Sequence, residues 1–308
     1  MNAITLRDVT KSFGQKTILE GLNLTVPQGS IFGFVGENGA GKTTTMKLLL
    51  GLLPPDSGKI TILGEPVRMG GSSTNRNIGY LPDVPSFYSY MRATEYLRLC
   101  GEITDMDPQQ ISKRTKELLQ LVGLSNVNKK IGGYSRGMKQ RLGLAQALLN
   151  EPAILICDEP TSALDPIGRR AFLDIFAGLR QKTTVLFSTH ILNDVEAICD
   201  HVALLHKGQI QLGGPLDEIK QSYGAFQYEV IFTEVSACEK LAVALQVQTD
   251  LPGSVKTSGE SLTISVSQPE TEGRKLLNLI EKLALLPRSF RLVEPDLEQI
   301  FLKVVANS

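Results

Sequence analysis

A glycine-rich segment near the N-terminus carries the clearest chemistry of the sequence. Four residues separate Gly36 from the triplet Gly41-Lys42-Thr43, which is the spacing of a phosphate-binding P-loop. Glycines let the backbone approach a phosphate chain closely, the lysine adds a positive charge, and the threonine hydroxyl is a ligand for Mg²⁺. The segment therefore predicts a site for a nucleoside di- or triphosphate.

The loop also has the flanking elements that this motif requires. The apolar run 31–35 predicts a strand, and residues 46–50 begin a helix whose positive N-terminal end favours phosphate. A glycine-rich turn with an incidental lysine is the alternative, and the flanking strand and helix argue against it. The candidate nucleotide ligands of the loop are Gly36, Asn38, Gly39, Ala40, Gly41, Lys42, Thr43 and Thr44.

Two acidic residues follow a second apolar run, AILICDEP. Asp158 ends this predicted buried strand, at the edge of the sheet where open α/β folds bind ligands. Its carboxylate can hold Mg²⁺ directly or through water, together with Thr43. Glu159 is one residue further on and can orient and deprotonate an attacking water. The alternative is an acidic turn that closes the strand.

Four further positions are candidates with open alternatives. His190 ends the apolar run KTTVLFSTH and can donate from Nε2 to a γ-phosphate, or form only structural hydrogen bonds. Ser135 is a natural helix N-cap and Gly137 lets the first turn approach an anion, although an ordinary capped helix explains both equally well. Phe13 precedes a turn and either stacks on a base or packs in the core.

The pattern along the chain predicts a cassette at residues 1–220 and a smaller unit at 221–308. Residues 3–35 predict short strands in an antiparallel meander that leads into the P-loop strand. Residues 87–150 predict a helical insertion, with Asp107 as an N-cap and Pro108 in the first turn. Residues 221–308 predict a separate α+β domain, and the order of its elements favours the ferredoxin-like type.

Composition narrows the class of protein. The 308 residues contain 32 basic and 32 acidic side chains, so no excess of positive charge indicates nucleic acid as a partner. The four cysteines have no metal-binding spacing and are typical of reduced, mostly buried thiols. Because no apolar run of about 18 residues occurs, we expect the chain not to enter or cross a membrane by itself.

These motifs together resemble those of the ATP-binding cassette (ABC) ATPases, over about residues 1–220. GENGAGKTT is similar to the Walker A sequence, YSRGM to the signature motif, ILICDEP to Walker B, SALD to the D-loop and STH to the switch-histidine segment. The resemblance implies an α/β fold with a RecA-like core, an antiparallel β subdomain and a helical insertion. It implies ATP and Mg²⁺ as cofactors.

The resemblance also assigns roles to the candidate residues. It implies Glu159 and His190 as catalytic residues, Phe13 as the residue that stacks on adenine, and Thr43, Asp158 and Asp83 near the metal. This chain departs from the usual motifs in two places. Asp83 stands where many members have glutamine, which puts direct metal ligation in doubt, and in the signature motif Arg136 and Met138 replace glycine and glutamine. Ser135 and Gly137, which would contact phosphate, are retained.

The family resemblance implies an assembly of two cassettes arranged head to tail. The two cassettes are identical chains or close paralogues. Each ATP lies between the P-loop of one cassette and the signature helix of the other. We expect an ATPase subunit of an exporter with a separate ABC-2-like membrane permease, at the cytoplasmic face of the membrane. A non-transport ABC protein acting on ribosomes or DNA is the main alternative. A regulatory module that only binds ATP is a third, which the presence of Glu159 disfavours.

Overall fold

The computed structural model describes residues 1–70, 73–223, 226–247, 254–294 and 296–306. These residues form two compact units, Met1–Leu216 and Asp217–Ala306. The division falls at the start of helix α7 (Leu216–Tyr223), close to the expected boundary at residue 220. The first unit contains two sheets and the second contains one, and each unit has its own core.

An antiparallel sheet begins the first unit. Its strands are β1 (Asn2–Phe13), β2 (Lys16–Pro27), β4 (Ser57–Ile62) and β5 (Glu65–Pro66), in the order β2-β1-β4-β5. Strands β1 and β2 form a long hairpin whose turn contains Gly14 with a φ of 60°, a backbone conformation that glycine adopts readily. The antiparallel character of this segment agrees with the sequence pattern.

The second sheet of this unit contains the P-loop strand. Its order is β10-β9-β3-β8-β7-β6, and all neighbouring pairs are parallel except β9 and β10. The strands are β3 (Ile31–Gly36), β6 (Ile78–Leu81), β7 (Ile154–Asp158), β8 (Thr184–Thr189), β9 (His201–His206) and β10 (Gln209–Pro215). Strand β3 therefore pairs with β8 and β9 and does not continue the antiparallel meander. Its six buried residues are typical of a parallel strand covered on both faces.

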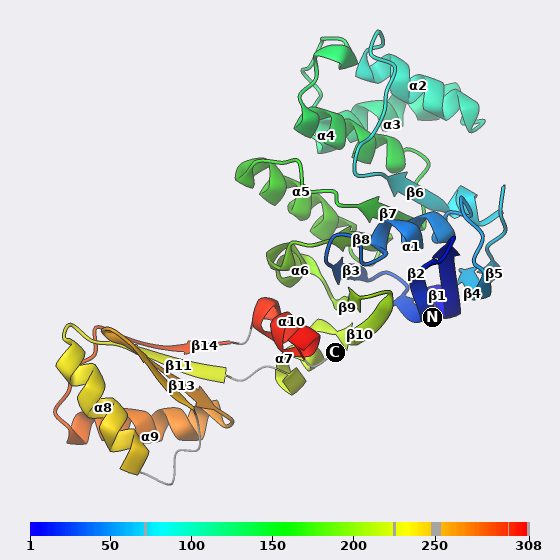
Figure 1. The fold of residues 1–308 in the computed structure, drawn as a ribbon. Coiled ribbons are helices and arrows are strands. Elements are labelled where there is room, and N and C mark those ends of the chain that lie inside the picture. The colour runs from blue at the N-terminus through cyan, green and yellow to red at the C-terminus, as the bar shows by residue number, and fades with distance from the viewer. Residues whose placement is uncertain (71–72, 224–225, 248–253, 295, 307–308) are drawn as a thin grey trace. The chain divides into compact units, whose positions relative to one another are not determined.

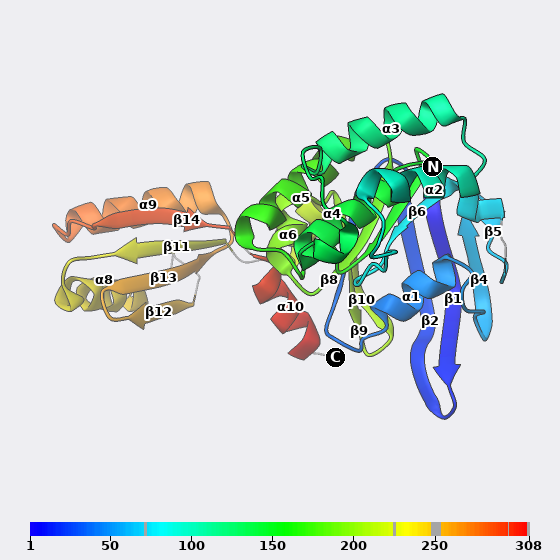
Figure 2. The same ribbon diagram turned by 90° about the horizontal axis from the view of Figure 1, so that it is seen from above.

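Helices cover both faces of this sheet (Figures 1 and 2). Helix α1 (Lys42–Leu49) and the antiparallel sheet share a core with Phe34, Ile156 and Leu186 on one face. Helices α5 (Pro166–Leu179) and α6 (Leu192–Ile198) lie on the other face, where the Phe176 and Phe187 rings are 5.7 Å apart. Because β3, β8 and β7 are parallel neighbours, their carboxyl ends meet at one edge of the sheet.

The expected helical insertion contains α2 (Ala93–Ile103), α3 (Pro108–Leu121), a short 3₁₀ helix at Ile131–Gly133 and α4 (Arg136–Ala147). Another 3₁₀ helix, Ser73–Asn77, lies before β6 and outside this insertion. The Asp107 carboxylate accepts hydrogen bonds from the N–H groups of Gln109 and Gln110, as expected for an N-cap. The Ser135 hydroxyl likewise accepts a hydrogen bond from Met138 N at the start of α4. The sequence therefore predicted both helix starts correctly.

The second unit has a ferredoxin-like topology. After α7 its elements are β11 (Phe226–Ile231), α8 (Val235–Val247), β12 (Val255–Ser258), β13 (Ser261–Val266), α9 (Pro269–Lys282), β14 (Ser289–Val293) and α10 (Leu297–Ala306). The sheet is antiparallel in the order β12-β13-β11-β14, the arrangement of a β-α-β-β-α-β unit. Leu241 of α8 and Leu276 of α9 share one buried cluster with Val230 of β11.

Across the described ranges, no helix combines the length and the hydrophobicity that a membrane-spanning segment needs.

Candidate nucleotide-binding site

The P-loop is held in an open, glycine-dependent conformation at the end of β3. Gly41 has a φ of 113° and forms the N-cap of α1 without a side-chain cap, while Gly39 has a φ of 86° and open space where a side chain would lie. A Cβ on Gly36 would lie 2.5 Å from the carbonyl oxygen of Leu205. The loop thus needs glycine at positions 39 and 41 for its backbone conformation and at position 36 for close packing. Asn38 is exposed and Ala40 is buried beside it.

Lys42 is buried and turned back toward its own loop. Its Nζ donates to the carbonyl oxygens of Gly36 at 2.6 Å and Glu37 at 3.1 Å. The same Nζ lies 3.3 Å from Glu159 Oε1, and only 6% of the lysine side chain is exposed. This ammonium group is therefore held in place by three oxygen atoms from the two segments that border the site.

Strand alternation directs Asp158 toward helix α1. Ile154, Ile156 and Asp158 project to the same face of β7, and the first two pack in the core that α1 shares. Thr43 Oγ1 donates to Asp158 Oδ2 at 2.7 Å, and the Ser188 hydroxyl donates to Asp158 Oδ1. The structure therefore brings the two expected metal ligands, Thr43 and Asp158, into direct contact.

Glu159 has a left-handed backbone conformation with a φ of 47°. Such a conformation is costly for a residue with a Cβ and is found mainly where the surrounding structure imposes it. Here the Glu159 N–H donates to the backbone oxygen and the hydroxyl of Ser188. The carboxylate is 14% exposed, and Oε1 accepts no hydrogen bond from the described residues apart from its ion pair with Lys42.

His190 contacts the second oxygen of this carboxylate. Its Nδ1 lies 2.9 Å from Glu159 Oε2. Because a carboxylate oxygen only accepts hydrogen bonds, the proton of this contact is on Nδ1. A neutral His190 then carries a lone pair on Nε2, so donation from Nε2 requires a protonated ring or the loss of this contact.

A buried network that the sequence motifs do not predict supports the β7–α5 loop (residues 159–165). Asp194 of α6 is 2% exposed, accepts a hydrogen bond from Thr161 Oγ1 at 2.6 Å and pairs with Arg169 of α5. Its only sequence signal is its position four residues after His190 on a short helix. Ser188 was also missed, although its place in the STH segment, one strand from Asp158, is a usable signal.

The remaining candidates lie apart from this cluster. Ser135 is exposed, and its hydroxyl contacts Met138 N of its own helix, whereas Gly137 faces Leu164 of the β7–α5 loop. Asp83 Oδ1 lies 3.3 Å from the Ser162 hydroxyl and 3.7 Å from Arg136 Nη2.

Phe13 is half-exposed at the end of the β1–β2 hairpin, and Lys11 Nζ lies 5.5 Å from its ring centroid. Thr44 is half-buried in the first turn of α1.

The negative charge of Asp158 also affects its neighbours. Burial and this charge raise the pKa of Tyr80 to about 12. Burial raises the pKa of the Cys157 thiol well above its usual value, and Asp158 adds to that effect. Both groups therefore stay neutral near pH 7.

Comparisons with known proteins identify the family. The family model "ABC transporter" matches residues 19–162, and the model "ATP-binding protein DrrA1-3-like, C-terminal domain" matches residues 214–305. The ABC transporter ATP-binding protein YxlF of Bacillus subtilis is 39% identical over 98% of this chain and 99% of its own length. The chain therefore belongs to the ATP-binding proteins of ABC transporters.

Two further relatives carry transport names. The Nod factor export ATP-binding protein I of Rhizobium sp. (strain N33) is 34% identical over 99% of this chain and 97% of its own length. The bacitracin transport ATP-binding protein BcrA of Bacillus licheniformis is 41% identical over 71% of each chain. These relatives favour the transport assignment over an ABC ATPase acting on ribosomes or DNA.

Solved structures support the fold of the cassette. The structure of an ATP-binding subunit of an ABC transporter aligns with a TM-score of 0.65 at 32% identity, over 72% of this chain and 93% of the other. The dimeric, ADP- and Pi-bound cassette MJ0796 aligns with a TM-score of 0.63 at 25% identity, over 69% and 98%. The expected fold class is thus confirmed.

Proposed function

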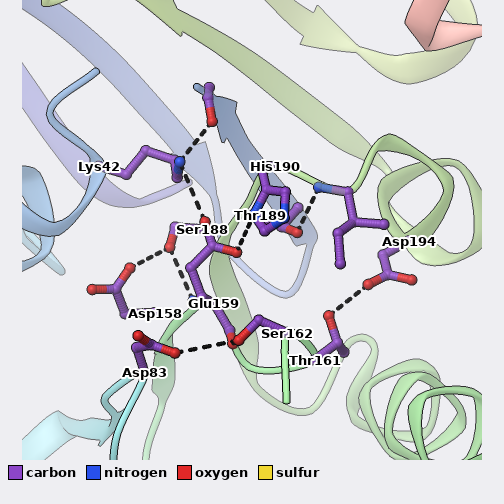
Figure 3. Close-up of polar contacts among 12 residues, drawn as sticks. Lys42, Asp83, Asp158, Glu159, Thr161, Ser162, Ser188, Thr189, His190 and Asp194 are labelled. Carbon is purple, nitrogen blue, oxygen red and sulfur yellow. Dashed lines mark hydrogen bonds and ion pairs between the residues drawn. The ribbon is translucent and has the colours of Figure 1, made fainter. Parts of the chain in front are cut away.

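We propose that this chain is an ATP-hydrolysing, Mg²⁺-dependent subunit that drives export through a separate membrane-spanning permease. One observation carries the proposal: Lys42, Thr43, Asp158, Glu159 and His190 converge at the carboxyl edge of one parallel sheet, joined by the contacts in Figure 3 and by the Thr43–Asp158 hydrogen bond. We assign this activity to the cassette at residues 1–220, with its helical subdomain at about 87–150. Residues 221–308 form an accessory domain.

The residues of the P-loop fit a nucleoside triphosphate. The N-terminus of α1 has no side-chain cap, and its dipole and N–H groups favour a bound anion. Lys42 exchanges its carbonyl contacts for phosphate oxygens, which are stronger, charged acceptors. Gly36, Asn38, Gly39, Ala40, Gly41 and Thr44 form the rest of the phosphate-binding loop. Phe13, at the end of its hairpin, stacks on the adenine.

Thr43 and Asp158 fit a magnesium ion. Both are oxygen donors, they already touch, and Mg²⁺ prefers such ligands. Thr43 would bind the ion directly, and Asp158 directly or through water. When bound, Mg²⁺ neutralises charge on the phosphates. Asp83 as a further, water-mediated contact stays a prediction.

Glu159 has the position and surroundings of a general base. Apart from its ion pair with Lys42, the buried Oε1 has no partner among the described residues, so it can accept a proton from a water when Lys42 turns to the phosphates. His190 holds the other oxygen and orients the carboxylate. Its second ring nitrogen is then available for the γ-phosphate when the ring is protonated.

A complete site requires two chains in this proposal. Ser135 and Gly137 lie at the exposed start of α4 and supply a second helix N-terminus for the nucleotide of a partner cassette. The dimeric relative with bound ADP and Pi supports this arrangement. The partner is a second copy or a close paralogue, and the closed dimer exists only with the triphosphate bound. The pair works at the cytoplasmic face of the membrane, and no nucleic acid is expected as a partner.

The Glu159→Gln variant tests the proposal. We expect purified variant protein to bind ATP, to release phosphate at least about a hundredfold more slowly because the general base is lost, and to elute as a dimer with ATP. The matched control is Glu102→Gln in α2, where the glutamate is exposed and distant in sequence. Near-normal hydrolysis by the Glu159 variant would contradict the assignment. Co-purification of a multi-span membrane protein would test the permease partner.

A further inference from the structure

Asp83 joins three segments that are far apart in the sequence. It follows β6, and its side chain is 46% exposed. Its Oδ1 lies 3.3 Å from the hydroxyl of Ser162 in the β7–α5 loop and 3.7 Å from Nη2 of Arg136, the first residue of α4. The Ser162 hydroxyl also lies 3.0 Å from the carbonyl oxygen of Glu159. One carboxylate oxygen thus connects the start of α4 with the loop that carries Glu159.

A second contact joins the same two segments. A Cβ on Gly137 would lie 3.1 Å from Leu164 Cδ2, so the first turn of α4 already packs closely on the β7–α5 loop. The Leu164 N–H donates to the Thr161 carbonyl oxygen, which keeps the loop folded. The loop is therefore attached to α6 through Thr161 and Asp194, and to α4 through Ser162, Asp83 and Arg136.

The two contacting charges stand at the two places where this chain departs from the usual motifs. Asp83 replaces a glutamine and Arg136 a glycine, and the new side chains carry opposite charges. We infer that Asp83 is a positioning residue that holds the first turn of α4 against the β7–α5 loop within one nucleotide-free subunit. The arginine side chain is 63% exposed, and an exposed ion pair is weak enough to open when another group takes its place.

This role differs from that of a metal contact at the same residue. The ion pair of the tether needs only opposite charges at positions 83 and 136, and the Ser162 hydroxyl can accept a hydrogen bond as well as donate one. A Mg²⁺ contact, in contrast, needs an oxygen at residue 83. Exchanging the two charges therefore separates the roles. Asp83→Arg combined with Arg136→Asp restores the ion pair but removes any oxygen ligand from position 83.

Hydrogen exchange without nucleotide or metal tests the tether. The amides of Met138 and Lys139 report on the start of α4, and those of Ser162 and Leu164 report on the loop. We expect Asp83→Asn and Arg136→Gln each to speed exchange at both places about two- to fivefold, the range of an exposed ion pair. The charge-exchanged double variant returns to the wild-type rate. Arg98→Gln, which breaks an exposed pair within α2, leaves these amides unchanged.

Two outcomes would overturn the inference. One is unchanged exchange in both single variants. The other is a double variant that exchanges as fast as the single ones. Titration of the same variants with ADP and Mg²⁺ is the second readout: weakened binding in both Asp83→Asn and the double variant, with unchanged exchange in the absence of ligand, would assign Asp83 to the metal instead. Because the exchange measurement contains no ATP, it does not depend on the hydrolytic activity proposed above.

Discussion

Lys42 Nζ lies 3.3 Å from Glu159 Oε1, so the lysine of the P-loop and the carboxylate after β7 form an ion pair across the site. The two side chains are 6% and 14% exposed, which shields the pair from solvent. A nucleotide whose phosphates attract Lys42 must compete with this pair and with the carbonyl oxygens of Gly36 and Glu37. Lys42 must therefore give up these contacts before its ammonium group can bind a phosphate.

Removing the charge of Glu159 should ease that competition. We expect Glu159→Gln to bind ADP about two- to tenfold more tightly than the wild type, a gain of about 0.4–1.4 kcal/mol. Calorimetric titration with ADP measures the difference without hydrolysis. Glu151→Gln, at an exposed glutamate before β7, is the control and should bind as the wild type does. Weaker or unchanged ADP binding by the Glu159 variant would show that the ion pair does not oppose the nucleotide.

Removing the lysine should have the opposite effect on affinity. Lys42→Met deletes the charged donor that we propose contacts the phosphates, and hydrogen bonds to charged groups contribute about 1.5–3 kcal/mol. We expect the dissociation constant for ADP to rise roughly ten- to a hundredfold. Lys47→Met, an exposed lysine on the same helix, should stay within about twofold of the wild type. Equal affinities of the two variants in the same titration would argue against a phosphate contact at Lys42.

Two glycine variants separate packing from flexibility. Gly36→Ala forces a Cβ to 2.5 Å from the Leu205 carbonyl oxygen, and we expect the free energy of unfolding to fall by about 1–3 kcal/mol. Gly178→Ala in α5 meets nothing within 4 Å and should raise the free energy of unfolding by about 0.5–1 kcal/mol. Urea denaturation compares both variants. An unchanged midpoint for Gly36→Ala would mean that β9 yields at this contact.

The buried Asp194 should be important for stability. Asp194→Ala leaves Arg169 and Thr161 without their shared partner, and we expect unfolding to become easier by about 2–3 kcal/mol. This is below the 3–5 kcal/mol of a fully buried pair because Arg169 is 28% exposed. Asp174→Ala, which breaks an exposed pair with Arg170 in α5, should change stability by no more than about 0.5 kcal/mol. Thermal unfolding of the two variants side by side gives the comparison, and equal melting temperatures would refute it.

The sequence predicted the parts of the fold that depend on local pattern. Buried strands, helix caps at Asp107 and Ser135 and the P-loop with its flanking elements all follow from short segments, and the structure contains each of them. The sheet to which β3 belongs did not follow, because pairing of β3 with β8 and β9 joins residues more than 150 positions apart. A hairpin-rich N-terminal segment gives no signal for such pairing.

The same distinction applies to the site. Spacing within a motif identified Lys42, Thr43, Asp158, Glu159 and His190, and they lie together. Their roles in catalysis and metal binding stay predictions. The partners of Asp194 and Asp83 could not be found in this way, since each is set by how separate helices and loops pack rather than by spacing along the chain.

The φ of 47° at Glu159 has a consequence for how this sequence can change. Glycine would relax the backbone at that position, because it adopts positive φ without a steric penalty. A Glu159→Gly variant would thus gain stability at this position but lose the carboxylate on which the proposed reaction depends. A screen that rewards only folding should therefore favour glycine at position 159, whereas a screen that rewards ATP hydrolysis should keep the carboxylate that the proposed reaction needs.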